Sequence, residues 1–509
     1  MHRARLLTIA LAITCCSTAA AHDPIAKTKL GELKGVHLND RGVVVFKGVH
    51  YGQSTAGAAR FKPGKPVAKW QGVADATKFG NICPQAGDVG RRTTTEGELL
   101  KVSEDCLVLN VWTPQTDDQA RPVMVWFHGR GFYAGAGSEP LYDGARLAKR
   151  GDLVVVTVNH RLNVFGHLYL GKVGGDEFAA SGNAGTQDMQ LALEWVRDNI
   201  AAFGGNPKNV TIFGESGGGA KVSTLLGVPS AKGLFQRGII ESGSRLNGAP
   251  LANAIKNTET VMAKLKVMTA AQLQALPMET LLAAVTTTGR TEPDFGPVTD
   301  GKYLPVDMFV PAAAASSHNV PVIAGSNRDE YSLYARELPN FGKRTEDEIR
   351  KELAPLYGKN VDELVAAYKQ SRPNASPWDV MIGIRSSRFH VGTVRLAEAQ
   401  SKVAPMYVYS FDFEPTAMKA AHGAEIPFVF SNATANANAR PGAKAVEDAM
   451  SDAWIAFARN GNPNHSGMPN WPTYNATTRS VMVFDAKTAA VNDLRAAERK
   501  VWEGKQLVR

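Results

Sequence analysis

One stretch constrains the fold more than any other: an apolar run, a glycine-flanked serine and a helical run follow one another between residues 210 and 226. Residues 210–213 (V-T-I-F) are apolar or β-branched, which predicts a buried strand. Residues 214–218 match the pattern G-x-S-x-G around Ser216, and residues 220–226 have helical apolar spacing. In this context the pattern predicts a sharp strand-to-helix turn that exposes the serine oxygen at the end of a sheet. The alternative is an ordinary glycine-rich turn.

Strands and helices are predicted to alternate along most of the chain. Strand-like runs lie at 107–112, 122–127, 153–158, 238–242, 320–325, 405–413 and 480–485. Helical patterns lie at 142–149, 185–203, 251–290, 345–400 and 445–460, with a break at 371–377. This alternation predicts an α/β fold with a large, mostly parallel sheet that has helices on both faces. Residues 28–52 alternate and turn at 39–42, which predicts an N-terminal antiparallel meander.

The composition fits one large globular domain. The 509 residues are 44% hydrophobic and 21% charged, with a net charge of +9. No run of Lys and Arg is long enough to indicate a nucleic-acid partner, so we interpret the charge as a solvated basic surface. No repeat or long linker divides the chain, and after the N-terminus no apolar run approaches the ~18 residues of a membrane span. We therefore predict a single domain over residues 22–509. The sequence does not predict its oligomeric state.

Residues 1–21 have the features of a secretory signal peptide. A basic segment at 2–5 precedes an apolar segment at 6–14 and an A-x-A-like cleavage site at 19–21. We expect an exported protein, periplasmic or extracellular, with a precursor lipid-anchored through Cys15 or Cys16 as the alternative. Only Cys83 and Cys106 survive cleavage, and two cysteines in an exported chain most simply pair. Two buried free thiols are the alternative.

A serine nucleophile needs a histidine base and an acid that orients the histidine. In a strand–serine–helix context the acid and then the histidine follow the serine, each after the end of a strand. His422 follows the 405–413 strand with Gly423 beside it, whereas the alternative is a surface or structural histidine. The acid is expected in 326–330, where spacing alone does not choose between Asp329 and Glu330. Either carboxylate could also be a solvated loop residue.

The reaction also needs hydrogen-bond donors for a developing oxyanion. Residues 127–132 (F-H-G-R-G-F) close a predicted strand and resemble the HGGG-type loop that supplies such amides. The candidate donors are the backbone amides of Arg130, Gly131 and Gly217. The chain has no P-loop, no CxxC pair and no HExxH motif, so we expect neither a metal nor an organic cofactor.

Several long segments resemble the type B carboxylesterases, the cholinesterase-like branch of the α/β-hydrolases. They are 103–112 (SEDCLVLNVW), 159–166 (NHRLNVFG), 183–188 (NAGTQD), 211–220 (TIFGESGGGA) and 422–430 (HGAEIPFVF). The resemblance covers about residues 28–485. It implies the α/β-hydrolase fold and a serine esterase that hydrolyses small-molecule carboxylic esters through an acyl-enzyme.

The resemblance also implies roles for single residues. It selects Glu330 as the acid of a triad with Ser216 and His422. The remaining implied features are a disulfide between Cys83 and Cys106, ion pairs Arg60–Glu104 and Arg161–Asp188, a buried electrostatic role for Glu215 and a supporting role behind the triad for Ser242.

The chain departs from the family pattern in three places. No aromatic residue lies between Cys83 and Cys106, which argues against choline esters because a quaternary ammonium group is bound by aromatic faces. Residues 52–58 (G-Q-S-T-A-G-A) replace a proline-rich stretch. Arg130 stands where the oxyanion loop normally has glycine, so its side chain either grips a carboxylate-bearing ester or turns to a structural partner. A catalytically silent binding protein is a further alternative.

Overall fold

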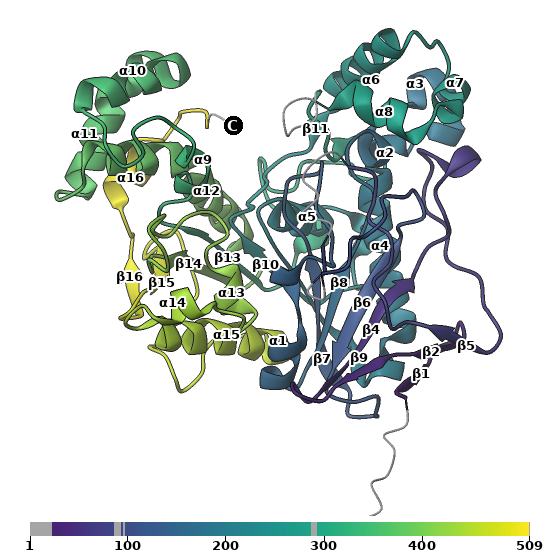
Figure 1. Ribbon diagram of the computed structural model, residues 1–509. Coiled ribbons are helices and arrows are strands. Elements are labelled where there is room, and N and C mark those ends of the chain that lie inside the picture. Colours follow the sequence, from purple (N-terminus) through teal and green to yellow (C-terminus); the bar gives the residue numbers. More distant parts are fainter. Residues whose placement is uncertain (1–22, 86–92, 95–96, 287–292, 508–509) are drawn as a thin grey trace, which may run out of the picture.

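A large mixed sheet forms the centre of the molecule (Figure 1). The computed structural model describes the whole chain except residues 1–22, 86–92, 95–96, 287–292 and 508–509. The sheet has 11 strands, in the spatial order β16 (Ala489–Asn492), β15 (Ser480–Phe484), β14 (Met406–Phe411), β13 (Val322–Asn327), β10 (Arg237–Glu241), β9 (Gly205–Glu215), β7 (Arg121–Phe127), β8 (Val154–Val158), β6 (Val108–Thr113), β4 (Val43–His50) and β3 (Val36–Leu38). Neighbouring strands are parallel from β15 to β8 and antiparallel at both edges. The predicted mostly parallel sheet and N-terminal meander are thus confirmed.

Helices cover both faces of this sheet. One face carries α4 (Ala184–Asn199), α5 (Gly217–Leu226) and α12 (Pro377–Gln400), and the other carries α1 (Ala145–Gly151), α13 (Ile426–Val429) and α15 (Ala443–Asn460). Helix α12 begins at the predicted break, where the Ser376 hydroxyl accepts a hydrogen bond from the Asp379 amide and Pro377 takes the first helical position. Helix α15 ends at Asn460 and is followed by Gly461, whose φ of 80° is left-handed.

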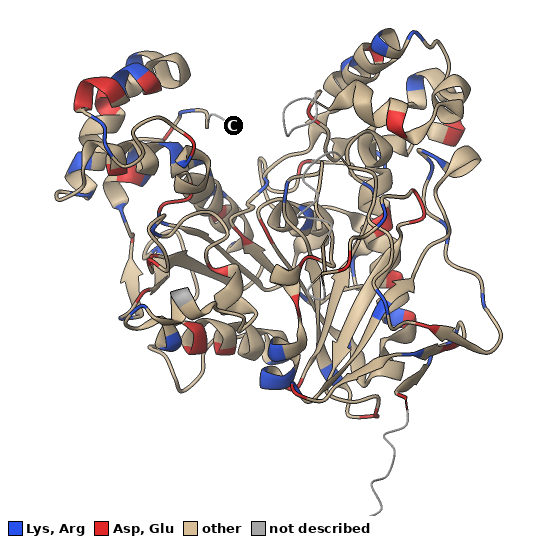
Figure 2. Cartoon of the chain, viewed as in Figure 1, with Lys and Arg blue, Asp and Glu red and all other residues tan. Residues whose placement is uncertain are grey.

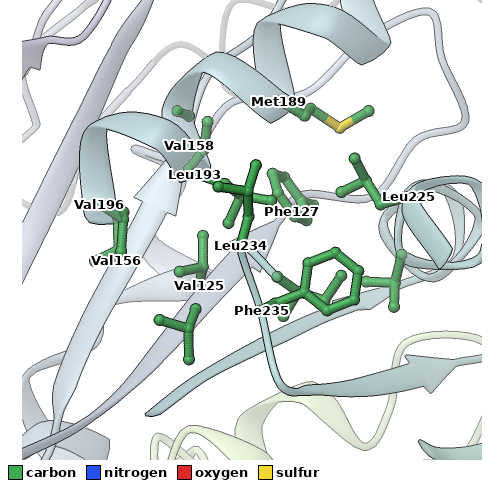
Figure 3. Close-up of a cluster of buried hydrophobic side chains, with 14 of the residues drawn as sticks. Val125, Phe127, Val156, Val158, Met189, Leu193, Val196, Leu225, Leu234 and Phe235 are labelled. Carbon is green, nitrogen blue, oxygen red and sulfur yellow. The ribbon is translucent and has the colours of Figure 1, made fainter. Parts of the chain in front are cut away.

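The apolar strands are buried on both faces, and their side chains alternate between two core layers. In β7, Val123, Val125 and Phe127 face the α4 and α5 side, and Met124 and Trp126 face the α1 and α15 side. Figure 3 shows the first layer, in which Val125 and Phe127 pack with side chains from β8, α4 and α5. Continuous burial is why these strands read as unbroken apolar runs in the sequence.

Two helical groups lie beyond the sheet, at the upper left and upper right of Figure 1. The left group contains α9 (Ser332–Ala335), α10 (Glu346–Tyr357), α11 (Val361–Ser371) and α16 (Ala496–Lys500). The right group contains α2 (Asn163–His167), α3 (Gly171–Gly174), α6 (Leu251–Leu265), α7 (Ala270–Ala275) and α8 (Met278–Val285). Each group has its own apolar cluster. Figure 2 shows acidic and basic positions interspersed along α10 and α11, as expected for solvated helices.

Short elements escaped the sequence analysis because they have too few residues to show a period. They include strands β1 (Ile25–Lys27) and β5 (Val73–Asp75), which flank β2 (Glu32–Lys34) of the predicted meander in a small sheet, the pair β11 (Ala249–Pro250) and β12 (Val298–Thr299), the edge strand β16 and the short helices α2, α3, α9, α13, α14 (Ala435–Asn438) and α16. The strand predicted at 320–325 begins at Val322 and continues to Asn327. That extension brings the end of the strand closer to the candidate acids.

Three covalent or ionic ties expected from the sequence are present. A disulfide joins Cys83 to Cys106. The buried ion pair between Arg60 and Glu104 has a shortest N–O distance of 2.5 Å, and the pair between Arg161 and Asp188 one of 2.6 Å. The expected signal peptide at 1–21 lies outside the described residues. Among the residues that the structure does describe, no helix has the length and apolar character needed to cross a membrane.

Candidate active site

Ser216 sits on the turn between β9 and α5. Its backbone has φ 57° and ψ −118°, a sparsely populated conformation for a residue with a side chain, and the turn is tied down by the hydrogen bond that its amide donates to the Glu241 carbonyl at 2.8 Å. A Cβ at Gly218 would lie 2.0 Å from the Phe127 carbonyl oxygen, so only glycine fits there. Ser216 itself is partly exposed. The geometry is that of a strained turn presenting an accessible hydroxyl.

The other candidate residues follow neighbouring parallel strands, which end at the same edge of the sheet. Strand β10 lies between β9 and β13, and β14 pairs with β13 on the far side. Glu330 follows β13, and His422 follows β14. The His422 Nδ1 lies 2.5 Å from Glu330 Oε2, and the Glu330 side chain is fully buried. Sheet topology therefore brings together residues separated by 92 positions.

The neighbouring acid, Asp329, points elsewhere. Its carboxylate accepts hydrogen bonds from the Arg328 guanidinium at 2.9 and 2.7 Å. Glu330 instead accepts a hydrogen bond from the Asn327 amide at 2.8 Å, which fixes the carboxylate that faces His422. Of the other histidines, His390 contacts the Ser326 hydroxyl at 2.8 Å and His465 contacts the Ala449 carbonyl. Among the histidines that the structure describes, only His422 stands beside both a buried glutamate and the serine turn.

The second imidazole nitrogen of His422 faces Glu215. Its Nε2 lies 3.2 Å from Glu215 Oε1, while no hydrogen bond between Ser216 and His422 is found among the described residues. The Glu215 side chain is buried, as its implied electrostatic role requires. The imidazole thus lies between two carboxyl groups, with one on each nitrogen.

A buried polar network lies behind this arrangement. Asn327 Nδ2 donates to the Ala421 carbonyl at 2.7 Å and to Glu425 Oε2, and Ser242 Oγ donates to Glu425 Oε1 at 3.4 Å. The sequence analysis implied a supporting role for Ser242 but assigned none to Glu425 or Asn327. The Glu425 position in the 422–430 motif was the available signal, since a glutamate in an apolar run must be buried with partners.

Burial and mutual repulsion alter the protonation of these glutamates. Desolvation, with the charges of Glu330 and Glu241, raises the pKa of Glu215 well above its ordinary value. Desolvation and the neighbouring carboxylates do the same to the pKa of Glu425. Desolvation raises the pKa of Glu241 to about 8, opposed by the hydrogen bond that Trp454 Nε1 donates to it at 2.8 Å. These three glutamates favour the neutral form.

The loop after β7 lies against the start of α5. A Cβ on Gly217 would lie 2.3 Å from the Gly131 amide nitrogen, so the two backbones are in direct contact. Arg130 and Gly131 both have positive φ, 64° and 57°. Within the described chain, the amides of residues 130, 131 and 217 donate no hydrogen bond. Three adjacent amides are therefore available beside Ser216.

The Arg130 side chain is held by Glu139. Its Nε and Nη2 donate to the two Glu139 carboxylate oxygens at 3.2 and 3.0 Å, and the Ala136 amide donates to the same carboxylate. This two-point contact favours the interpretation of Arg130 as an arginine turned to a structural partner. The guanidinium is already neutralised, so it offers little to a substrate carboxylate.

Lys221, in α5, is a site residue that the sequence analysis missed. Its side chain is fully buried, and its Nζ donates to the His128 carbonyl at 2.7 Å, at the base of the same loop. Desolvation lowers the pKa of Lys221 well below its ordinary value. A lysine on the inward face of a helix next to the serine was the signal, since lysine is almost never fully buried without a partner.

Comparison with known proteins identifies the family. The model of the Carboxylesterase family matches residues 22–502. The chain is 37% identical to the para-nitrobenzyl esterase of Bacillus subtilis, over 94% of this chain and 98% of that protein. It is 32% identical to the phenmedipham hydrolase of Pseudarthrobacter oxydans, over 92% of this chain and 96% of that protein.

The fold agrees with a solved structure. The crystal structure of a Geobacillus stearothermophilus carboxylesterase matches with a TM-score of 0.83 and 37% identity, over 94% of this chain and 99% of that one. The fold is accordingly that of the α/β-hydrolases, as predicted. The chain belongs to the carboxylesterase family and is a carboxylic ester hydrolase.

Proposed function

We propose that the chain hydrolyses carboxylic esters through a triad of Ser216, His422 and Glu330 and a covalent acyl-enzyme. The observation that carries this proposal is the 2.5 Å contact between His422 and the buried Glu330, next to the turn that presents Ser216. A buried carboxylate at Nδ1 holds the imidazole in the tautomer whose Nε2 can accept a proton.

The reaction follows from these positions. Ser216 Oγ attacks the ester carbonyl while His422 Nε2 takes its proton, and Glu330 stabilises the imidazolium. The amides of Arg130, Gly131 and Gly217 bind the oxyanion of the tetrahedral intermediate, and each such donor is worth about 3 kcal/mol in related sites. His422 then protonates the leaving alcohol, and water releases the acid by the same steps. Serine–histidine contacts are often loose in unliganded hydrolases and tighten when substrate binds.

The location of the protein is part of the proposal. We propose that residues 1–21 direct export and that residues 22–509 form one exported domain. The basic, apolar and A-x-A-like segments support a cleaved signal peptide, and a disulfide at Cys83–Cys106 suits an oxidising compartment.

A fluorophosphonate probe tests the nucleophile directly. Wild type should be labelled and should hydrolyse 4-nitrophenyl butyrate, while Ser216→Ala should lose both properties and keep its thermal midpoint. Ser223→Ala, on the same helix, serves as the matched control and should still be labelled. Absence of labelling and of turnover in folded wild type would favour a silent binding protein over the enzyme.

A further inference from the structure

Two arginines of α12 lack the hydrogen-bond acceptors that other arginines in this region have. Arg372 is bonded to Glu498, Arg328 to Asp329 and Glu414, and Arg395, later in α12, donates to backbone carbonyls. By contrast, the guanidinium groups of Arg385 and Arg388 form no hydrogen bond or ion pair with any described residue. Both side chains are partly exposed.

These arginines are held over aromatic rings instead. The Arg388 Cζ lies 4.5 Å from the centre of the Phe389 ring and 5.4 Å from that of Tyr334. The Arg385 Cζ lies 4.1 Å from the centre of the Tyr331 ring, which stacks on Tyr334 at 5.9 Å. These cation–π contacts place the guanidinium groups against rings but give their N–H groups no acceptor among the described residues.

The same rings line the candidate site. The Phe389 ring centre lies 4.8 Å from the imidazole of His422, and the Tyr334 ring centre lies 5.5 Å from it. One aromatic ring, that of Phe389 or that of Tyr334, therefore lies between Arg388 and the imidazole of His422. The Tyr334 side is open, because that residue is 43% exposed. A substrate group that extended from Ser216 past His422 toward α12 would meet this cation.

We propose that Arg388 binds a carboxylate carried by the ester substrate, so that the site prefers monoanionic esters, with Arg385 adding to the positive field. The proposal rests on the esterase function proposed above. A guanidinium whose N–H groups have no acceptor in the described chain suits the two oxygens of a carboxylate. Arg130, a cation beside the serine turn, is already bonded to Glu139 and leaves this role to α12.

Matched ester pairs test the proposal and locate the charge. For the acyl side, the pair is mono-4-nitrophenyl adipate and 4-nitrophenyl hexanoate; for the alcohol side, it is 4-(butanoyloxy)benzoate and its methyl ester. For each pair we measure kcat/KM for the anionic ester and for its neutral partner, and we take the ratio of the first to the second. In the methyl ester, the bond followed is the butanoyl ester. In Arg388→Met this ratio should fall roughly tenfold in at least one pair, the size of a charge-assisted hydrogen bond at a partly exposed site.

Two variants control for charge and structure. Arg388→Lys keeps the positive charge but not the paired N–H groups, so its ratio should lie between those of wild type and Arg388→Met. Arg197→Met removes an equal charge from the exposed face of α4, where Arg197 pairs with Asp198, and should leave the ratio unchanged. Raising NaCl to 0.5 M should lower the ratio in wild type but hardly in Arg388→Met, because salt screens exposed charge.

The outcomes distinguish failure of the carboxylate site from failure of the proposed esterase function. If wild type hydrolyses the neutral esters and Arg388→Met keeps the wild-type ratio in both pairs, the carboxylate site is wrong and the esterase stands. If wild type hydrolyses none of the four esters and is not labelled by the fluorophosphonate, the esterase itself is wrong. An equal drop in Arg388→Met and Arg197→Met would assign the effect to net charge and overturn the role of Arg388.

Discussion

Asp329 and Glu330 are adjacent in sequence, yet the structure gives them opposite surroundings. Asp329 is neutralised by Arg328, whereas Glu330 is fully buried against His422 and takes a hydrogen bond from the Asn327 amide. The difference arises because successive side chains after β13 point in different directions. No rule of spacing in the sequence distinguishes them, and the choice of Glu330 came from family resemblance alone.

Replacing each acid by its amide separates these roles. Glu330→Gln should lower kcat by about 10³- to 10⁴-fold with little change in KM, because an amide does not hold the imidazole in the productive tautomer. Asp329→Asn should change kcat by less than about tenfold and act mainly on stability through Arg328. Steady-state kinetics on 4-nitrophenyl butyrate, with circular dichroism as a folding check, measure both. A larger loss of kcat in Asp329→Asn than in Glu330→Gln would make Asp329, and not Glu330, the acid of the triad.

Glu241 carries a measurable cost of burial. Its pKa is raised to about 8, so between its ordinary value of 4.5 and about 8 the folded chain holds a proton that the unfolded chain has lost. Because the folded state binds more protons there, its stability falls as pH rises through this interval. The cost is at most about 1.4 kcal/mol per pH unit.

Glu241→Gln should therefore stabilise the chain more at pH 8 than at pH 5. Glutamine keeps an oxygen that can accept the Trp454 hydrogen bond and has no charge to desolvate. The measurement is the thermal midpoint of variant and wild type at both pH values, with Glu346→Gln as a surface control that should show no such increase. A difference that shrinks toward pH 8 would contradict the neutral form of Glu241.

At the scale of elements, α5 and the loop after β7 act as one unit. Gly217 contacts Gly131 directly, and Lys221 Nζ bonds the His128 carbonyl, so the helix that follows the serine also holds the loop of candidate oxyanion donors. Strand, turn and helix were predictable from their apolar spacing and glycines. This contact between the helix and a loop some 90 residues earlier was not, because it depends on β7 and β9 being neighbours in the sheet.

Lys221→Met tests this connection. Methionine has a similar volume but no donor, so the His128 carbonyl loses its partner and the loop amides lose their fixed orientation. We expect kcat to fall by about ten- to a hundredfold with little change in KM, less than the loss of one complete oxyanion donor. Lys232→Met, at an exposed position, should match wild type. A change in thermal midpoint without a change in kcat would limit Lys221 to a structural role.

At the scale of the whole molecule, the sequence predicted what depends on local patterns. The parallel sheet and its meander follow from apolar runs, whereas the buried ion pairs Arg60–Glu104 and Arg161–Asp188 were implied only by the family resemblance that the long motifs carry. The fate of Arg130 was not predictable, because its partner Glu139 lies in a loop with no regular pattern. The aromatic contacts of Arg388 were hidden for a related reason, since Tyr334 and α12 meet only in the tertiary structure.

The disulfide between Cys83 and Cys106 makes the stability of the fold depend on the redox state of the surroundings. Cys83 and Cys106 close a loop over a sequence separation of 23, and a cross-link of that span stabilises a chain by about 3 kcal/mol, chiefly by restricting the unfolded state. The double variant Cys83→Ser/Cys106→Ser should therefore unfold at lower temperature than wild type under non-reducing conditions. A reducing agent should lower the thermal midpoint of wild type toward that of the variant and leave the variant unchanged. Equal midpoints for wild type and variant, each with and without the reducing agent, would mean that the cross-link does not stabilise the folded chain.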